Sequence, residues 1–403
     1  MNSSSRFAAL GSPAFRRYLI GQLPSITCSW AQVVALSWAV VARDPAALGW
    51  VVALQFAPSL LLGPWFGAVT DRHDRRRILM LAETGLGLVA VGYALAAATD
   101  RLSVPLIYLL ATLWGVVNAL DTPARRALVP MLVTVHQAAS ASALTGIVLL
   151  LGMTAGSALG AGLVAAAGLA VTFAMNAASF LIDVVLLYTI RVGASPRIPR
   201  APRQMSEGLA YVWRTPRLRM PLLGLAILAT LAFTVQVSAP ILLRTSFAGG
   251  PSLVGAAVTA VTAGGLAGAV AAGRGTPGPR HLRQASVVMA AALVTTAVAP
   301  TVPVVLAGLA GIGFAWSVFI TSTVAILQTA EPALMGRVMS WFAAVLIGGT
   351  AAGGPLAGSI AGLGGPRAPF LLGAAAAVAA GVITGPRPAR ARPDRVPVTS
   401  SVR

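Results

Sequence analysis

Long apolar segments alternate with short polar turns along almost the whole chain. Twelve such segments lie at residues 18–41, 48–69, 78–98, 104–120, 139–163, 169–190, 222–243, 253–272, 285–299, 302–327, 338–361 and 369–383. Most of them approach or exceed the roughly 20 residues that an α-helix needs to cross the hydrocarbon core of a bilayer. The pattern therefore predicts an all-α membrane protein with twelve transmembrane helices, which we number spans 1 to 12.

The composition agrees with a polytopic membrane protein. Of the 403 residues, 57% are hydrophobic and only 10% are charged, whereas soluble proteins carry about 25% charged residues. The sequence contains no lysine, which a Walker A phosphate loop requires, so ATP hydrolysis by this chain is not expected. Because the sequence also shows no pairing of nucleophile and base and no cluster of metal ligands, we expect neither an enzyme nor a cofactor nor a bound metal ion.

The arginines indicate the orientation of the chain. Of the 29 arginines, 25 fall in the terminal segments or in the turns on one side of the predicted topology, and four fall on the other side. Basic residues favour the cytoplasmic side, so we predict that both termini are cytoplasmic. The wealth of alanine, glycine and arginine suggests a bacterium and hence its plasma membrane. The arginines cluster at short turns, and this membrane-orientation pattern accounts for the net charge of +19. We therefore expect no nucleic-acid partner.

The chain divides into two similar halves. Gly156-Ser157-Ala158-Leu159-Gly160 in span 5 resembles Gly354-Pro355-Leu356-Ala357-Gly358 in span 11, about 200 residues later, and Trp114 and Trp316 are separated by a similar interval. Two six-span halves related by duplication are typical of transporters. We predict an N-terminal half at 1–190, a cytoplasmic linker at 191–219, a C-terminal half at 220–385 and a disordered cytoplasmic tail at 386–403.

The predicted linker contains one segment with helical character. Met205, Leu209, Val212 and Trp213 recur at helical spacing among polar residues, which indicates a short amphipathic helix at the membrane surface. An irregular loop with incidental hydrophobic residues is the alternative.

A dense run of charge separates spans 2 and 3. Six of the seven residues from Asp71 to Arg77 are charged, so they form a tight turn at the membrane surface. The pattern Gly67-x-x-x-Asp71-Arg72-x-x-Arg75-Arg76 resembles the signature loop of the major facilitator superfamily, with Asp74 where that loop usually has glycine. Further matches are Phe15-Arg16-Arg17-Tyr18-Leu19-Ile20-Gly21-Gln22, Asp121-x-Pro123-x-Arg125, Asn176-Ala177-Ala178-Ser179-Phe180 and Gly336-Arg337-Val338-Met339-Ser340. Together they resemble the drug–proton antiporter branch that includes macrolide-efflux and enterobactin-export permeases.

This resemblance implies the major facilitator fold and a conformational latch in the charged turn. The latch would hold the two halves together in the outward-open state, and the matching residues are Gly67, Asp71, Arg72, Arg75 and Arg76. The alternative is that these charges serve only to fix the topology.

Two acidic residues, Glu83 and Asp183, lie inside predicted spans. An ionisable group in a membrane span is costly and is functional by default. Desolvation favours the protonated form of a carboxyl group, so both residues are candidates for proton coupling. An ion pair that holds helices together is the alternative for each.

Polar and aromatic side chains recur at helical spacing in spans 1, 4, 7 and 10, which line the cavity in the family that the chain resembles. The candidates for the substrate cavity are Gln22, Ser25, Ser29, Gln32, Trp114, Asn118, Thr234, Trp316 and Thr321. Hydrogen bonds between helices are the alternative for the small polar residues. Gly152, Gly156, Gly160 and Pro355 are expected to permit close helix contact or bending.

The resulting functional prediction is a monomeric exporter of a hydrophobic small molecule that works by alternating access. A weakly polar, aromatic cavity suits a bulky hydrophobic ligand, and the resemblance implies proton coupling. Besides this ligand, we expect protons and membrane lipid as partners. A facilitator or importer on the same fold, or a membrane scaffold or sensor that transports nothing, remains the alternative.

Overall fold

The computed structural model describes residues 7–190, 204–274, 278–332 and 334–385. Over these ranges the chain is almost entirely helical and contains no strand. The predicted all-α fold class is therefore confirmed. The predicted tail at 386–403 and most of the predicted linker lie outside the described residues.

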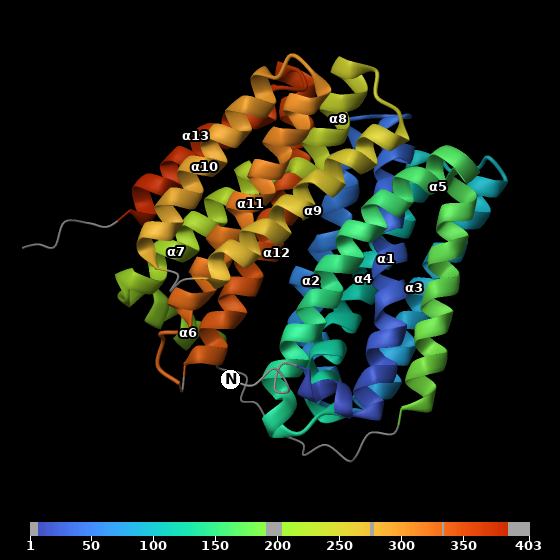
Figure 1. The fold of residues 1–403 in the computed structure, drawn as a ribbon, viewed down its shortest axis with the longest axis vertical. Coiled ribbons are helices and arrows are strands. Elements are labelled where there is room, and N and C mark those ends of the chain that lie inside the picture. The colour runs from blue at the N-terminus through green and yellow to red at the C-terminus, as the bar shows by residue number, and fades with distance from the viewer. Residues whose placement is uncertain (1–6, 191–203, 275–277, 333, 386–403) are drawn as a thin grey trace, which may run out of the picture.

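The described part of the N-terminal half contains five α-helices, of which the last folds back on itself, and three short 3-10 helices at Ala8–Gly11, Val129–Leu132 and Val135–Gln137. The α-helices are α1 (Pro13–Val41), α2 (Ala47–Arg72), α3 (Arg75–Ala98), α4 (Val104–Leu128) and α5 (Ala138–Thr189). Within α5, Gly168 has a φ of 82°, a left-handed conformation that glycine adopts readily. The chain reverses there, and Figure 1 shows the two arms of α5 joined near the top of the view and separating toward the bottom, with α1 between them. The first arm (138–167) and the second arm (169–189) correspond to spans 5 and 6.

The C-terminal half follows a short helix, α6 (Gln204–Arg214), which lies where the sequence indicates the amphipathic segment. The remaining elements are α7 (Pro216–Ile227), the π-helical turn η5 (Leu228–Ala232), α8 (Val235–Phe247), α9 (Pro251–Gly273), α10 (Pro279–Val298), α11 (Val302–Leu327), α12 (Met335–Gly364) and α13 (Ala368–Thr384). Span 7 is thus not one helix, because η5 and two non-helical residues separate α7 from α8.

The number of membrane-crossing segments fits the prediction of twelve. Ten helical runs of the described chain are long and apolar enough to cross a membrane, and α13 is a shorter apolar helix. One of the ten runs is the folded-back α5, whose two arms each have the length of a span. The described residues therefore accommodate all twelve predicted spans.

Near the charged turns, the end of α4 and the start of α3 differ from the simple loops expected from the sequence. Span 4 was expected to end at Leu120, but α4 continues to Leu128, which makes Asp121 and Arg125 helical residues. At the start of α3, the Asp74 carboxylate accepts hydrogen bonds from the backbone N–H groups of Arg76 (2.9 Å) and Arg77 (3.3 Å). Asp74 is therefore a helix N-cap, which explains an aspartate at this position.

The two halves meet mainly through two pairs of helices, α2 with α12 and the first arm of α5 with α9, and α1 adds smaller contacts with α8 and α9. At these contacts the backbones touch, because a Cβ atom on Gly49 would overlap the backbone of Gly354, and one on Gly255 would overlap Ala161. Toward the other end of α2, a Cβ atom on Gly63 or Gly67 would meet nothing within 4 Å. The seam between the halves is therefore closed at one end only.

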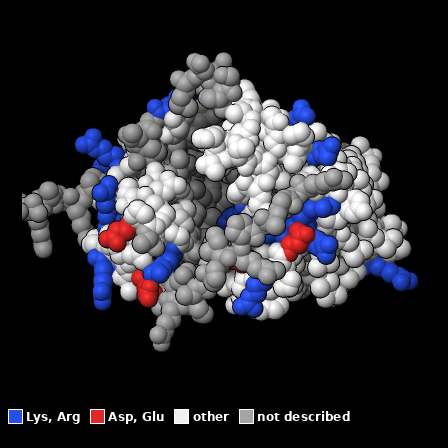
Figure 2. Space-filling view, turned by 90° about the horizontal axis from the view of Figure 1, so that it is seen from below, with Lys and Arg blue, Asp and Glu red and all other residues white. Residues whose placement is uncertain are grey.

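The open end of the molecule is the arginine-rich end, where the turn at 72–77 and the start of α12 lie. At the opposite end, which we call the far end, one hydrophobic core joins Leu48 of α2 to Ile241 of α8 and Ala357 of α12. At the arginine-rich end the core of the N-terminal half contains residues of that half alone. The halves touch near the top of Figure 1 and diverge toward the bottom, and Figure 2, seen from below, shows the surface hollowed between them.

Candidate functional site

Four charged side chains from three helices meet inside the N-terminal half. They are Glu83 of α3, Asp121 and Arg125 of α4, and Asp183 in the second arm of α5. The Arg125 guanidinium lies at the centre, with Nη2 3.1 Å from Asp121 Oδ1 and Nη1 3.5 Å from Asp183 Oδ2. Its Nη2 also donates to Glu83 Oε1. We call this group the Arg125 cluster.

The Arg125 cluster is deeply buried and has more carboxylates than cations. The Glu83 side chain is 1% exposed and that of Asp183 is 0% exposed. With all four groups ionised the cluster would carry a net charge of −2, which is costly in a low-dielectric environment. Glu83 Oε2 and both carboxylate oxygens of Asp183 also lack a hydrogen-bond partner in the described structure. A proton on one of these carboxyl groups would reduce the net charge and supply a hydrogen-bond donor.

Local helix geometry brings these residues together. Asp121 and Arg125 are four residues apart, so they share one face of α4. Across the bundle, α1 presents Gly21 to Asp183, where a Cβ atom would overlap the carboxylate. Tyr18 of the same helix lies beside Arg125, and the buried Gln22 Oε1 has no hydrogen-bond partner in the described chain.

The sequence identified two of the four members of this cluster. Glu83 and Asp183 were singled out separately, and the structure joins them through a shared arginine. Asp121 and Arg125 were missed because they were placed in a loop beyond span 4. Their spacing of four residues was the available signal, since it would align an acid and a base on a continued helix.

The residues of the predicted latch anchor the charged turn to its own half in this conformation. Arg76 Nε donates to the carbonyl oxygen of Leu187 at 2.7 Å, and its guanidinium lies 5.6 Å from the centre of the Tyr188 ring. Arg75 Nη1 donates to Met131 Sδ at 3.2 Å. Arg76 therefore caps the C-terminal end of α5, where cations are favoured by the helix dipole.

The other latch residues lie at the end of α2. Asp71 is half-buried and Arg72 is exposed, and Gly67 faces open space. These positions are at the open part of the seam between α2 and α12.

The polar face of α1 packs against the second arm of α5. Asn176 Nδ2 donates to Gln32 Oε1 at 2.9 Å, and Ser29 Oγ donates to Asn176 Oδ1 at 3.3 Å. Gln22 and Ser25 are buried as well. In this conformation Gln32 and Ser29 connect α1 to the second arm of α5, which is the alternative given for the small polar residues.

The glycines of span 5 form a close contact with α1. Cβ atoms at the three positions would overlap atoms of Ile26, Thr27 and Ala31, and the positions are Gly152, Gly156 and Gly160. The first arm remains helical at all three, and the reversal of α5 occurs at Gly168. In the second half, Pro355 of α12 follows Gly354 at the seam with α2.

The remaining cavity candidates lie on both halves. Trp114 of α4 packs against Leu86 and Phe180. Asn118 is half-buried on the same face of α4 as Asp121, and Thr321 is half-buried on α11.

The break in span 7 brings two aromatic rings together. Phe233 follows η5 with a ψ of 46°, and its ring stacks on that of Trp316 of α11 with centroids 4.1 Å apart and an interplanar angle of 5°. Thr234 is buried, and its Oγ1 lies 3.3 Å from Ser238 Oγ. The sequence pattern predicts Trp316 and Thr234 as site residues but gives no sign of the helix break or of the partner Phe233.

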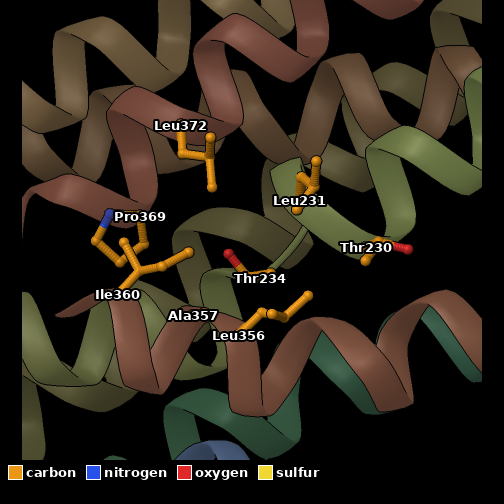
Figure 3. A pocket seen from close by; sticks show the side chains of 8 residues that line it. All are labelled: Thr230, Leu231, Thr234, Leu356, Ala357, Ile360, Pro369 and Leu372. Atoms are coloured by element: carbon orange, nitrogen blue, oxygen red, sulfur yellow. The ribbon is translucent and has the colours of Figure 1, made fainter. Parts of the chain in front are cut away.

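A small pocket lies between η5, the start of α8, α12 and α13 (Figure 3). Its lining is mostly apolar and consists of Thr230, Leu231, Thr234, Leu356, Ala357, Ile360, Pro369 and Leu372. The pocket has a volume of only about 10 Å³, far less than the roughly 300–1,000 Å³ of typical ligand sites. It is therefore too small to be the main site for a bulky substrate.

The chain resembles known transporters in sequence. Its residues 4–395 match the family described as transmembrane secretion effector. It is 28% identical over 308 residues to the enterobactin exporter EntS of Salmonella paratyphi A, covering 73% of this chain and 72% of that protein. It is 26% identical over 246 residues to the staphyloferrin A transporter of Staphylococcus aureus, covering 59% of this chain but only 61% of that transporter.

Solved structures share the same fold. A bacterial homologue of the iron transporter ferroportin in an inward-facing state superposes with a TM-score of 0.73 at 16% identity, covering 92% of this chain and 97% of that one. The nucleoside transporter NupG gives a TM-score of 0.67 at 12% identity, covering 92% of this chain and 98% of that one. The solved structures agree with the fold, and the family match over residues 4–395 shows that the chain belongs to the transmembrane secretion effector family of the major facilitator superfamily, whose members are transporters and not enzymes.

Proposed function

We propose that the protein exports a hydrophobic small molecule across a bacterial plasma membrane in exchange for protons. The observation that carries the proposal is the Arg125 cluster, in which one arginine faces three buried carboxylates. A group that gains and loses a proton inside the membrane is what proton coupling requires. The relatives named as exporters of enterobactin support the outward direction.

The arrangement of the halves supplies the transport step. We take the arginine-rich end as the cytoplasmic end, because basic residues are retained on that side. The described conformation is then open to the cytoplasm and closed outside. Substrate would enter from the cytoplasmic side, and rocking of the halves would close that side and open the far end.

Arg125 couples the proton to this movement. When a carboxyl group of the cluster is protonated, Arg125 interacts more strongly with the carboxylates that remain charged. Its guanidinium contacts both α3 and the second arm of α5. Protonation would therefore change how strongly α4 is held to these two helices, and the cluster would favour one conformation over the other.

The proposal is tested by accumulation of fluorescent hydrophobic compounds in bacteria that express the protein, with and without a protonophore. Enterobactin and staphyloferrin A join the panel because relatives are named for them. The expected result is exclusion of at least one compound, abolished by the protonophore and by Asp183→Asn. Asp100→Asn is the matched control, since Asp100 is an exposed acid in a turn. A compound flux that is the same with and without the protonophore would instead identify a facilitator.

A further inference from the structure

The stacked pair of Phe233 and Trp316 is the most distinctive feature of the C-terminal half. The rings are nearly parallel at 4.1 Å, and both side chains are only partly buried. Phe233 comes from the break in span 7 and Trp316 from the middle of span 10. The pair therefore bridges spans 7 and 10 at the level of a helix interruption.

Trp316 lies at the point of α11 where the side chains on one face change from fully buried to partly exposed. On the same helical face, Leu309 toward the far end is fully buried, whereas Ile320 and Val324 toward the arginine-rich end are half-buried. Ala307, on the opposite face, is exposed where lipid would surround the protein. The partly exposed Trp316 ring therefore lies on the inward-facing side of α11, opposite Ala307, where it meets Phe233.

The backbone that carries Phe233 is interrupted on both sides. Before it lies the π-helical turn, closed by a bond from Phe233 N–H to the Leu228 carbonyl oxygen at 2.7 Å, and after it α8 begins anew. π-Helical turns inside helices are frequent at functional sites. A ring held at such an interruption can move without breaking a continuous helix.

The π-helical turn η5 also contacts α12, the helix that packs against α2 of the N-terminal half. Cβ atoms on Gly349 and Gly353 of α12 would overlap Ala229 and Thr230 of η5, so the two backbones lie against each other. Because α12 packs on α2 of the N-terminal half, a movement of η5 would reach the seam between the halves.

The corresponding helix of the N-terminal half carries charge instead. Trp114 precedes Asp121 and Arg125 on α4, whereas the matching positions after Trp316 on α11 are Thr323 and Leu327. The two halves therefore differ in chemistry, with ionisable groups on α4 and uncharged groups on α11.

From these observations we infer that Trp316 is an aromatic subsite of the substrate cavity and that Phe233 occupies it when no substrate is bound. The ligand class is a molecule with a flat aromatic ring, which displaces Phe233 and stacks on Trp316. Displacement moves η5 and, through α12, the seam between the halves. This inference rests on the proposed function for its hydrophobic substrate, but it requires no proton gradient.

The test measures binding of N-phenyl-1-naphthylamine to the purified full-length protein, with paired competitors that carry a naphthalene or a saturated decahydronaphthalene group. Trp316→Leu is expected to weaken binding of the aromatic ligands roughly threefold to tenfold, and Trp316→Phe to weaken it less. Phe233→Ala is expected to tighten binding, because it removes the competing ring. Phe233→Leu should act in the same direction while filling more of the space. The saturated competitor should be affected much less by each variant.

Trp50→Leu is the control, since Trp50 is 54% exposed near the far end of α2. Weaker binding in both Phe233 variants, equal effects on the aromatic and saturated competitors, or no binding of the probe by the wild type would overturn the inference. Protonophore-sensitive export with unchanged binding in all variants would overturn it while leaving proton-driven export intact.

Discussion

The guanidinium of Arg125 is the only cation described within contact of three buried carboxylates, and this imbalance determines how each residue around it behaves. A buried ion pair is weak evidence for stability, but removal of one partner leaves an uncompensated charge. At the scale of single residues, both the Arg125 charge and the space around the Asp183 carboxylate should therefore matter for the protein.

Replacing Arg125 by glutamine should impair both stability and export. The change leaves three buried acids without a cation, and breaking a buried pair costs about 3–5 kcal/mol. Thermal unfolding of the purified protein should show a lower midpoint, partly restored in the double variant Arg125→Gln/Asp183→Asn. Arg126→Gln is the matched control because Arg126 is exposed. Equal unfolding midpoints for the two single variants would argue against the cluster as described.

Gly21 provides a test of geometry without a change of charge. A Cβ atom there would overlap the Asp183 carboxylate, so Gly21→Ala should displace Asp183 and reduce export severalfold at normal membrane abundance. Gly162→Ala is the control, since a Cβ atom at Gly162 would meet nothing within 4 Å. If Gly21→Ala exports at the wild-type rate, Asp183 does not need its present position.

At the scale of elements, the far end is closed by contacts between helices of different halves. One such contact is that of Gly49 with Gly354. In another, the Arg244 guanidinium of α8 lies 5.3 Å from the centre of the Trp38 ring of α1. Such cation–π contacts contribute about 0.5–1 kcal/mol at exposed sites. The contact joins the halves only while the far end is closed, so it favours the conformation described.

Arg244→Gln or Trp38→Leu should therefore increase the fraction of molecules open at the far end by roughly twofold to fivefold. Distances between spin labels placed on the far ends of α2 and α12 measure this fraction. Arg367→Gln is the control, because Arg367 donates to the carbonyl oxygen of Ala299 within one half. An unchanged distance distribution in both test variants would show that the contact of Arg244 with Trp38 does not favour closure of the far end.

The elements also show what the sequence could and could not predict. Span lengths and the arginine asymmetry were sufficient for twelve spans, because hydrocarbon thickness leaves few alternatives. The end of α4 was misplaced since charged residues normally mark a loop, and only their mutual pairing makes Asp121 and Arg125 acceptable in a buried helix. The break at Phe233 had no local signal, because packing against Trp316 and the α12 glycines is tertiary. For the same reason, the hydrophobicity pattern of span 1 could not distinguish whether the polar face of α1 lines a cavity or forms hydrogen bonds with Asn176.

At the scale of the whole molecule, transport requires the seam between α2 and α12 to open at one end as it closes at the other. Gly49 and Gly354 permit backbone contact at the far end, and Gly67 of the latch lies at the end that is now open. The latch and the far-end seam are therefore opposite contacts, each of which would be formed in only one of the two conformations.

A side chain inserted into the far-end seam should shift the whole molecule toward the outward-open state. Gly354→Val places methyl groups against the backbone of Gly49, so the closed seam cannot form. The same spin-label distances should lengthen, and export should fall because the inward-open state is depopulated. Gly63→Val is the matched control on α2, where no atom lies within 4 Å of the added Cβ. Persistence of the short distances in Gly354→Val would contradict a rocking movement about this seam.

If proton movement through the Arg125 cluster drives export, an imposed pH gradient should drive uptake of a transported dye into inside-out vesicles. Accumulation is expected when the vesicle interior is acidic, with none in the absence of a gradient and none in the Asp183→Asn variant under either condition. Equal uptake with and without the gradient, or gradient-driven uptake that survives in Asp183→Asn, would contradict this coupling.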